Sequence, residues 1–302
     1  MGEQLTIFEK AAVKKQQTQI VNVASVPQRS PFRYPGGKTW LIPTIREWLR
    51  QDNNKKNLIE PFAGGGIVSL TAAFENLADH ITMVELDEEV AAVWKTILSD
   101  KNEWLADRIL KFELSHENVN KELNNPNKEI KDIAFCTILK NRVFHGGIIA
   151  KGSGMLKNGE NGKGIASRWY AKTLADRIIA INFIKHKIQF LQTDAFKVIE
   201  QNRDNRNAYF FIDPPYTIAG KRLYTYFDID HEQLFYLTSK IQGKFMLTYD
   251  DTDEVRALAI KYHLAFRTIP MKTTHHLEKN EIIISDNFDW WTRTTGANSG
   301  LA

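Results

Sequence analysis

The sequence predicts an α/β fold in which seven strands alternate with helices and form a mostly parallel sheet, accompanied by a small additional subdomain. Three observations support this prediction. Residues 208–212 form an apolar and aromatic run that ends at an acid and two prolines, and a glycine cluster at 64–66 separates another short apolar run from a helical pattern. A third apolar run ends at the acid Glu85. All three are typical of the carboxyl edge of a parallel sheet, where ligands bind in open α/β folds.

The composition is that of a globular protein with a moderate excess of positive charge. Its 302 residues are 43% hydrophobic and 25% charged, and the net charge is +4. No apolar run approaches the roughly 20 residues of a membrane span, and the first 20 residues lack the core of a signal peptide, so we expect a cytoplasmic protein. The single cysteine, Cys136, excludes an internal disulfide and a cysteine-rich zinc site. We expect it in the core, on a helix.

The run at 208–212 is interpreted as a central strand covered on both faces. Asp213, Pro214, Pro215 and Tyr216 follow it directly. Neither proline can donate to a sheet ladder and both fix φ, so the acid before them and the ring after them are held on stiff backbone. The sequence therefore predicts a rigid site at the end of this strand.

The N-terminal part carries one weaker signal. Residues 1–29 are predicted to form an arm, and a disordered terminus explains them equally well. The glycine pair Gly36 and Gly37 then opens a helical pattern over 40–50, with Lys38 beside it. Glycines at the start of a helix bring backbone N–H groups close to a ligand, although a plain turn would also use them.

A nucleoside site is predicted from the next two strands. Residues 58–60 run into the glycine turn at 64–66, and the second strand at 81–84 ends at Glu85. A carboxylate about 20 residues beyond such a turn can accept hydrogen bonds from ribose hydroxyls. The position three past the last of these glycines is Ser69, so no intact Gly-x-Gly-x-x-Gly is present and nicotinamide binding is the weaker interpretation.

The segment 140–187 differs from the rest of the chain in charge. Ten lysines or arginines and two acids give it a net charge of +8 and leave −4 for the remainder. From Asn141 to Arg168 the helical pattern gives way to Gly, Asn, Ser and Lys. Such a segment suits contact with phosphates, and a solvated mobile loop is the alternative. The candidate nucleic-acid contacts in it are Asn141, Arg142, Lys151, Lys157, Lys163 and Arg168.

Residues 187–191 form another predicted strand, and Asp194 follows it, where it would also suit the N-cap of the next helix. Beyond Tyr216, basic and aromatic residues interleave, a pattern that can clamp a backbone and stack a base. These are Lys221, Arg222, Tyr224 and Tyr226. Three more strands complete the sheet, the last two joined by a hairpin-like connection, at 245–249, 265–269 and 281–285. His275 and His276 are adjacent and would diverge, so no metal site is predicted.

In the order and spacing of these motifs, over roughly residues 30 to 287, the chain resembles the Dam-type DNA adenine-N6 methyltransferases, the alpha group with Asp-Pro-Pro-Tyr. The resemblance implies the Rossmann-like fold of class I methyltransferases and S-adenosylmethionine as cofactor. The cofactor-binding residues that it implies are Tyr34, Gly36, Gly37, Lys38, Glu60, Phe62, Gly64, Gly66, Glu85, Leu86, Asp194, Ala195 and Asp213.

The same resemblance implies how the chain is divided and what it binds. The expected parts are an arm (1–29), a cofactor-binding part (30–125), a target-recognition insertion (126–187), a catalytic part (188–289) and a C-terminal tail (290–302) that Trp290 and Trp291 anchor. The expected partner is double-stranded DNA, bound by a monomer or weak dimer, and a cognate restriction enzyme would be compatible with this interpretation.

The catalytic residues implied are Asp213, Pro214, Pro215 and Tyr216. Adenine N6 is a poor nucleophile, and the Asp213 carboxylate and the Pro214 carbonyl would accept its two hydrogens while Tyr216 stacks on a base flipped out of the duplex. Two alternatives remain. An RNA or cytosine-N4 methyltransferase would use the same pocket, although the cytosine enzymes more often carry serine in place of Asp213. A non-catalytic nucleic-acid-binding module would not need both Glu85 and Asp213 at strand ends.

Overall fold

The computed structural model describes residues 26–33, 36–52, 54, 56–126, 128–150, 152–159, 162–216, 228–272 and 278–291, with the backbone alone at 271, 272, 278 and 279. Some residues singled out in the sequence lie outside these ranges. They are Tyr34, Lys151, Lys221, Arg222, Tyr224, Tyr226, His275 and His276.

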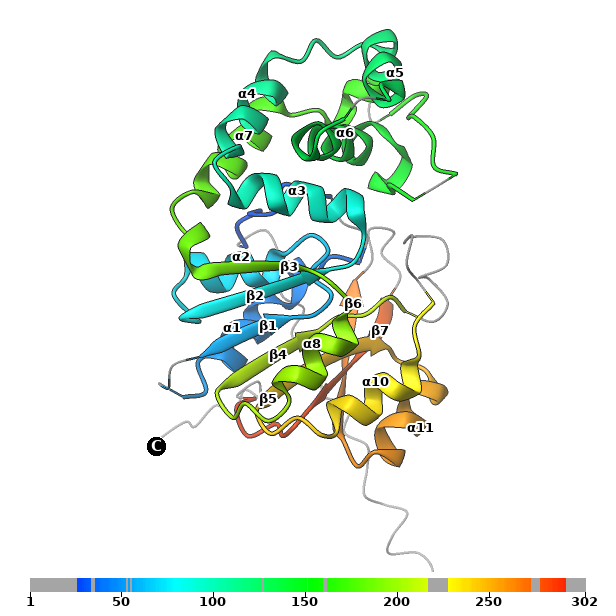
Figure 1. Ribbon diagram of the computed structural model, residues 1–302. Coiled ribbons are helices and arrows are strands. Elements are labelled where there is room, and N and C mark those ends of the chain that lie inside the picture. Colours follow the sequence, from blue (N-terminus) through cyan, green and yellow to red (C-terminus); the bar gives the residue numbers. More distant parts are fainter. Residues whose placement is uncertain are drawn as a thin grey trace, which may run out of the picture.

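A seven-stranded sheet in the order β3-β2-β1-β4-β5-β7-β6 forms the centre of the protein (Figure 1). The first five of these strands are parallel, and β7 runs antiparallel to β5 and β6. The predicted fold class is therefore confirmed, including the antiparallel pairing of the last two strands. The strands are β1 (Asn57–Glu60), β2 (His80–Glu85), β3 (Ile188–Gln192), β4 (Ala208–Ile212), β5 (Lys244–Asp250), β6 (Ala265–Lys272) and β7 (Glu278–Ser285).

Strand β4 lies in the middle of the sheet, and all five of its residues are buried. Because side chains alternate along a strand, Tyr209 and Phe211 enter the core on one face while Phe210 and Ile212 enter the core on the other. This explains why the segment is apolar throughout instead of alternating. It also fixes the place where the chain leaves the sheet at Asp213.

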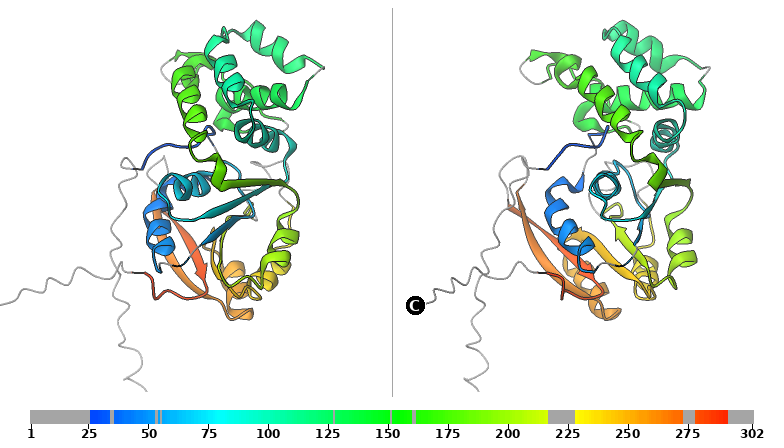
Figure 2. Two further views of the ribbon diagram at one scale, coloured as in Figure 1. Left: turned by 60° about the vertical axis from the view of Figure 1, so that its left-hand side comes forward. Right: turned by 90° about the vertical axis from the view of Figure 1, so that its left-hand side faces the viewer.

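Helices cover both faces of the sheet (Figures 1 and 2). One face packs against α1 (Ile42–Leu49), α2 (Ile67–Phe74) and α3 (Glu88–Leu98). The other packs against α8 (Ala195–Asn202), α10 (His231–Thr238) and α11 (Asp253–Lys261). Side-chain oxygens of Asp87, Asp194, Asp230 and Thr252 cap four of these helices. In the part of the chain that the structure describes, no helix is long and apolar enough to cross a membrane.

A second, helical part stands beyond α3, at the top of Figure 1. It contains α4 (Asn102–Lys111), α5 (His116–Asn124), α6 (Ile130–Val143) and α7 (Ala171–Ile181), with α6 against α3 and α4 against α7. Asn102 ties α4 to α7 by donating to the carbonyl of Ile178 at 2.8 Å. Thus α4 and α5 pack with the insertion predicted at 126–187, although they precede it in sequence. As predicted, Cys136 is buried on a helix, α6.

Short 3-10 helices occupy the connections that lead to and from the site. They are η2 (Lys38–Leu41), η3 (His145–Gly147), η5 (Gly164–Arg168) and η6 (Lys185–Lys187). At the C-terminal end, Trp290 and Trp291 are 7% and 8% exposed and pack into the core, so both rings anchor this segment as predicted.

Candidate cofactor and target-base site

A cavity of about 730 Å³ opens at the carboxyl edge of the sheet, where β1, β2 and β4 end. Many of the predicted site residues, which are scattered along the sequence, lie together in its wall. They are Gly36, Gly37, Lys38, Glu60, Phe62, Gly64, Gly66, Glu85, Leu86, Asp194, Ala195, Asp213 and Pro215. The grouping supports one continuous ligand site at the edge that the fold class favours.

The glycine turn after β1 is held tightly against its neighbours. The Trp94 Nε1–H donates to the carbonyl of Gly64 at 2.9 Å, and the backbone N–H of Ala63 donates to the carbonyl of Val84 at 2.9 Å. Gly66 has a φ of +62°, and a Cβ there would lie 2.6 Å from the Met83 Cε atom. A side chain at this position would therefore strain the backbone and crowd the buried side chains of Met83 and Trp94.

Glu85 ends β2 and faces the glycine turn. Its carboxylate accepts backbone N–H groups from Gly64 at 3.0 Å, Leu86 at 2.8 Å and Asp87 at 3.0 Å. Burial raises the pKa of Glu85 to about 7, although these hydrogen bonds oppose the shift. Two carboxylate oxygens offer about four acceptor sites, and these three bonds leave about one for a ribose hydroxyl.

Asp194 follows β3 and accepts the backbone N–H of Lys197 at 3.1 Å, which makes it the N-cap of α8. It also lines the cavity beside Ala195. The rings of Phe62 and Phe196 meet edge to face with centroids 6.5 Å apart at the same wall. The N-cap alternative is thus confirmed, and Asp194 stays a candidate neighbour of the cofactor adenine.

Glu60, at the end of β1, points toward the start of α2. It is 3% exposed and accepts the backbone N–H of Ser69 at 3.0 Å together with the Ser69 hydroxyl. Burial raises the pKa of Glu60 to about 8; the bonds from Ser69 oppose this shift, and the nearby Asp213 and Glu85 add to it. Glu60 therefore links strand and helix on the two sides of the glycine turn.

The catalytic candidate Asp213 is held by two donors. Lys38 Nζ lies 2.9 Å from Asp213 Oδ1, and the Thr248 hydroxyl donates to the same oxygen at 2.8 Å. Lys38 is 3% exposed, and although burial opposes its charge, Asp213 and Glu281 outweigh burial and raise the pKa of Lys38. Both donors contact Oδ1, so within the described part of the chain Oδ2 stays available to a further donor.

Tyr216 is fixed from two sides. Its ring stacks on the ring of Tyr249 with centroids 5.6 Å apart and an interplanar angle of 24°. Its hydroxyl donates to Glu281 Oε2 at 3.2 Å, and Lys38 Nζ lies 4.9 Å from its ring centroid. Burial raises the pKa of Tyr216 well above its ordinary value, so the phenol stays protonated.

Glu281 is a site residue that the sequence analysis did not identify. It lies 3.8 Å from Lys38 Nζ, is 4% exposed, and burial raises its pKa to about 7 although Lys38 opposes the shift. Glu281 pairs with Asp250 across β5 and β7, and β7 is antiparallel, so the beginning of β7 lies at the carboxyl edge. One signal was present in the sequence, namely a carboxylate that directly precedes the apolar run at 282–284.

The predicted DNA contacts of the insertion fall into two groups. Lys157 and Lys163 are exposed, as a phosphate contact requires, and Arg168 is half-buried. Asn141 and Arg142 are 1% and 4% exposed and lie in the wall of the cavity instead of on a free surface. Among the described residues, no group of three or more His, Cys, Asp or Glu side chains could hold a metal ion.

The sheet order and the cavity at its carboxyl edge fit the Rossmann-like fold of class I methyltransferases that the sequence predicts. A family model for D12 class N6 adenine-specific DNA methyltransferases matches residues 34–275. The chain belongs to this family, and it is an adenine-specific DNA methyltransferase. No curated protein matches the chain.

Several solved structures are similar in fold. A methyltransferase of Agrobacterium tumefaciens has a TM-score of 0.40 at 10% identity, with 83% of this chain and 62% of that chain covered. A putative RNA methyltransferase of Pyrococcus horikoshii has a TM-score of 0.37 at 11% identity, with 84% of each chain covered. M. capricolum TrmK, in complex with S-adenosyl-homocysteine, has a TM-score of 0.35 at 6% identity, with 80% and 66% covered.

Proposed function

We propose that the protein methylates N6 of an adenine that has been flipped out of double-stranded DNA, with Asp213 as the group that activates the amine. The observation that carries this proposal is the Asp213 carboxylate at the end of the central strand. Lys38 and Thr248 hold one of its oxygens, no described residue donates to the other, and Asp213 lines the cavity.

The cavity fits S-adenosylmethionine. Its volume of about 730 Å³ suits a cofactor of that size. Glu85 can receive a ribose hydroxyl, the glycine turn admits a close approach of backbone to ligand, and Phe62 with Phe196 offers an apolar wall for an adenine ring. When bound there, the cofactor supplies an electrophilic methyl group on a sulfonium sulfur.

Asp213 and Pro214 would make the target amine reactive. Adenine N6 gives its lone pair to the ring, and two acceptors for its hydrogens hold the nitrogen closer to tetrahedral. Asp213 Oδ2 and the Pro214 carbonyl are those acceptors in our proposal. Lys38 is buried beside Asp213, and a hydrogen bond from the amine to a carboxylate is charge-assisted.

Tyr216 would position the base. Its ring is already fixed by Tyr249 and by the hydroxyl contact to Glu281, so it offers a surface of one orientation on which a flipped adenine can stack. Positioning of this kind lowers the entropy that must be lost when the methyl group is transferred. Flipping is required because N6 is not accessible inside a duplex.

A direct test supplies the purified protein with labelled S-adenosylmethionine and with duplex DNA, single-stranded RNA or cytosine-rich DNA, followed by mass spectrometry of the nucleosides. We expect N6-methyladenine from the duplex and no N4-methylcytosine. Methylation of RNA or of cytosine alone would favour the alternative enzymes. A protein that binds duplex DNA but not the cofactor would be a binding module.

A further inference from the structure

At the end of the cavity away from Glu85, the wall is built from the strap, residues 30–33, and from the helical part. Figure 2 shows this blue segment passing between the sheet and the helices of the insertion. The Ser30 hydroxyl donates to the carbonyl of Gly65 at 2.5 Å, so the strap lies directly on the glycine turn. The strap therefore borders the same cavity as the glycine turn, and side chains that contact the strap lie beside this cavity.

Two arginines from different helices hold the strap by its carbonyl groups. Arg142 on α6 donates through Nη2 to Pro31, and Arg177 on α7 donates through Nη1 to Ser30 at 3.1 Å. Asn141 fixes Arg33 by accepting its N–H at 2.8 Å and donating to its carbonyl at 3.0 Å. As a result Arg33, Arg142 and Arg177 all line the same cavity.

Among these three arginines, Arg142 is buried without an acidic partner in the described part of the chain. Its side chain is 4% exposed, its Nε has no hydrogen-bond partner, and it forms no ion pair with any acid among the described residues. Burial, together with the charges of Arg177, Arg33 and Arg168, lowers the pKa of Arg142 to about 9. A buried charge without a counter-ion is costly unless a ligand supplies one.

We propose that Arg142 and Arg177, with Arg33 at the rim, bind the carboxylate at the methionine end of the cofactor. This inference rests on the proposed function, which places the nucleoside end at Glu85. The glycine turn lies between Glu85 and the strap, so a molecule that runs along the cavity from ribose to amino acid ends at these guanidinium groups. A guanidinium fork matches the two oxygens of a carboxylate.

A DNA phosphate is the other anion that such a cluster could take, and the enclosure argues against it. A phosphodiester continues into a nucleotide on each side, whereas Arg142 is only 4% exposed and is bonded to the strap at Pro31. The exposed lysines Lys157 and Lys163 are better placed for phosphates. Arg142 thus moves from the predicted DNA surface to the cofactor site.

The test measures binding by calorimetry without DNA, so it does not depend on activity. The two ligands are S-adenosylhomocysteine and 5′-methylthioadenosine, which shares the nucleoside and the thioether but lacks the amino acid part. The variants are Arg142→Met and Arg177→Gln; the glutamine keeps a donor for Ser30 if the first variant fails to fold. The exposed Arg206→Gln is the matched control.

We expect either cavity variant to weaken binding of S-adenosylhomocysteine at least about tenfold, as loss of a charged hydrogen bond does, with 5′-methylthioadenosine bound as before. Equal losses for both ligands, or no loss in either variant, would overturn the inference. So would unchanged ligand binding combined with a flatter salt dependence of duplex binding, since the arginines would then contact phosphate. If the wild type binds neither ligand, the proposed function fails as well.

Discussion

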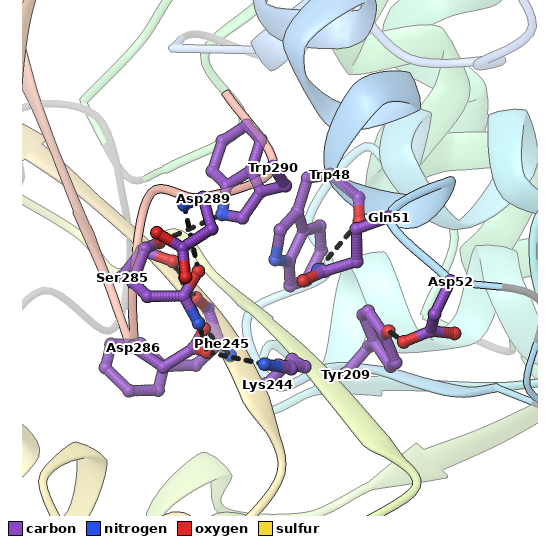
Figure 3. A network of polar contacts seen from close by, with 11 residues as sticks. Trp48, Gln51, Asp52, Tyr209, Lys244, Phe245, Ser285, Asp286, Asp289 and Trp290 are labelled. Atoms are coloured by element: carbon purple, nitrogen blue, oxygen red, sulfur yellow. Dashed lines mark hydrogen bonds and ion pairs between the residues drawn. The ribbon is translucent and has the colours of Figure 1, made fainter. Parts of the chain in front are cut away.

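The two edges of the central sheet differ in how their charged side chains are paired. At the amino edge, where β4 and β5 begin, the charged side chains have polar partners at hydrogen-bond distance (Figure 3). Lys244 Nζ lies 3.1 Å from Asp286 Oδ2, the Tyr209 hydroxyl donates to Asp52, and the Ser285 hydroxyl donates to the carbonyl of Phe245 at 2.9 Å. The acids Asp286 and Asp52 each have a lysine beside them, Lys244 and Lys56, so these charges are balanced.

At the carboxyl edge one lysine, Lys38, serves two acids, Asp213 and Glu281. Glu60 and Glu85 have raised pKa values near the same cavity, while Arg142 has a lowered one. Ionisable groups whose pKa values are shifted against the charged form are typical of sites that bind or transform ligands. The comparison therefore marks the carboxyl edge as the candidate site and the amino edge as its reference.

The largest difference between the edges should appear in matched alanine substitutions of Asp213 and Asp286. Asp213→Ala removes the acceptor for N6, so we expect kcat to fall at least about a hundredfold with duplex affinity retained. Asp286→Ala should leave kcat within about twofold and reduce the free energy of unfolding by about 1 kcal/mol, because this variant removes the hydrogen bonds to Lys244 and Phe245.

Single-turnover rates at saturating S-adenosylmethionine separate chemistry from cofactor binding in this pair. If Asp213→Ala methylates at the wild-type rate, the assignment of Asp213 is wrong. If Asp286→Ala loses activity while remaining folded, the amino edge is not the inert reference that the comparison assumes.

A smaller effect is expected at the nucleoside end of the cavity. Glu85→Ala removes an acceptor for a ribose hydroxyl and should weaken binding of S-adenosylhomocysteine by about 1.5 to 3 kcal/mol. Asp52→Ala is the control at the amino edge and should not change this affinity. Calorimetry on both variants checks the difference, and an unchanged affinity in Glu85→Ala would remove Glu85 from the site.

The two edges should also differ in how their contribution to stability depends on pH. Burial raises the pKa of Glu60 to about 8, so the folded state keeps a proton that the unfolded chain loses above its ordinary pKa. The stability from this group is complete at low pH and is lost as pH rises toward 8. At the amino edge, burial alone would raise the pKa of Asp52, but its hydrogen bonds outweigh burial and lower it, so its stabilising contribution is lost only in acid.

We therefore expect Glu60 to lower the free energy of unfolding by about 1 to 2 kcal/mol between pH 6 and pH 8. Glu60→Gln should remove this share of the slope and leave the shares of Glu85 and Glu281, whose pKa values are also raised. Denaturant titrations at both pH values measure it. An unchanged slope in Glu60→Gln would mean that another group binds the proton. Asp52→Asn should leave the slope between pH 6 and pH 8 as it is.

The elements of the fold were predictable because each has a local cause. The prolines after β4 end a strand, the glycines at 64–66 need a turn, and an acid at the end of β2 needs only its own strand to reach the edge. The central strand was equally clear, because apolar side chains on both faces leave no other interpretation of 208–212.

The residues that the sequence did not reveal depend on contacts between distant segments. Glu281 reaches the site through the antiparallel register of β5 and β7, which no local pattern encodes. Arg142 resembles a basic surface residue in sequence, yet the strap buries it from 111 positions away. Arg177 was passed over for the same reason, since its partner Ser30 lies 147 positions away.

The smallest effect is expected on the exposed part of the insertion, where charges are neither paired as at the amino edge nor buried as in the cavity. Lys157→Ala with Lys163→Ala should weaken duplex binding and flatten its dependence on salt, by about 0.9 in the slope of log affinity against log salt for each DNA phosphate that a lysine no longer neutralises. Lys240→Ala with Arg206→Ala removes the same charge near the amino edge and should leave the slope unchanged. Titrations between low and physiological salt measure both double variants. Equal slopes in the two would mean that the lysines of the insertion are solvated charges, and that DNA binds the protein through another surface.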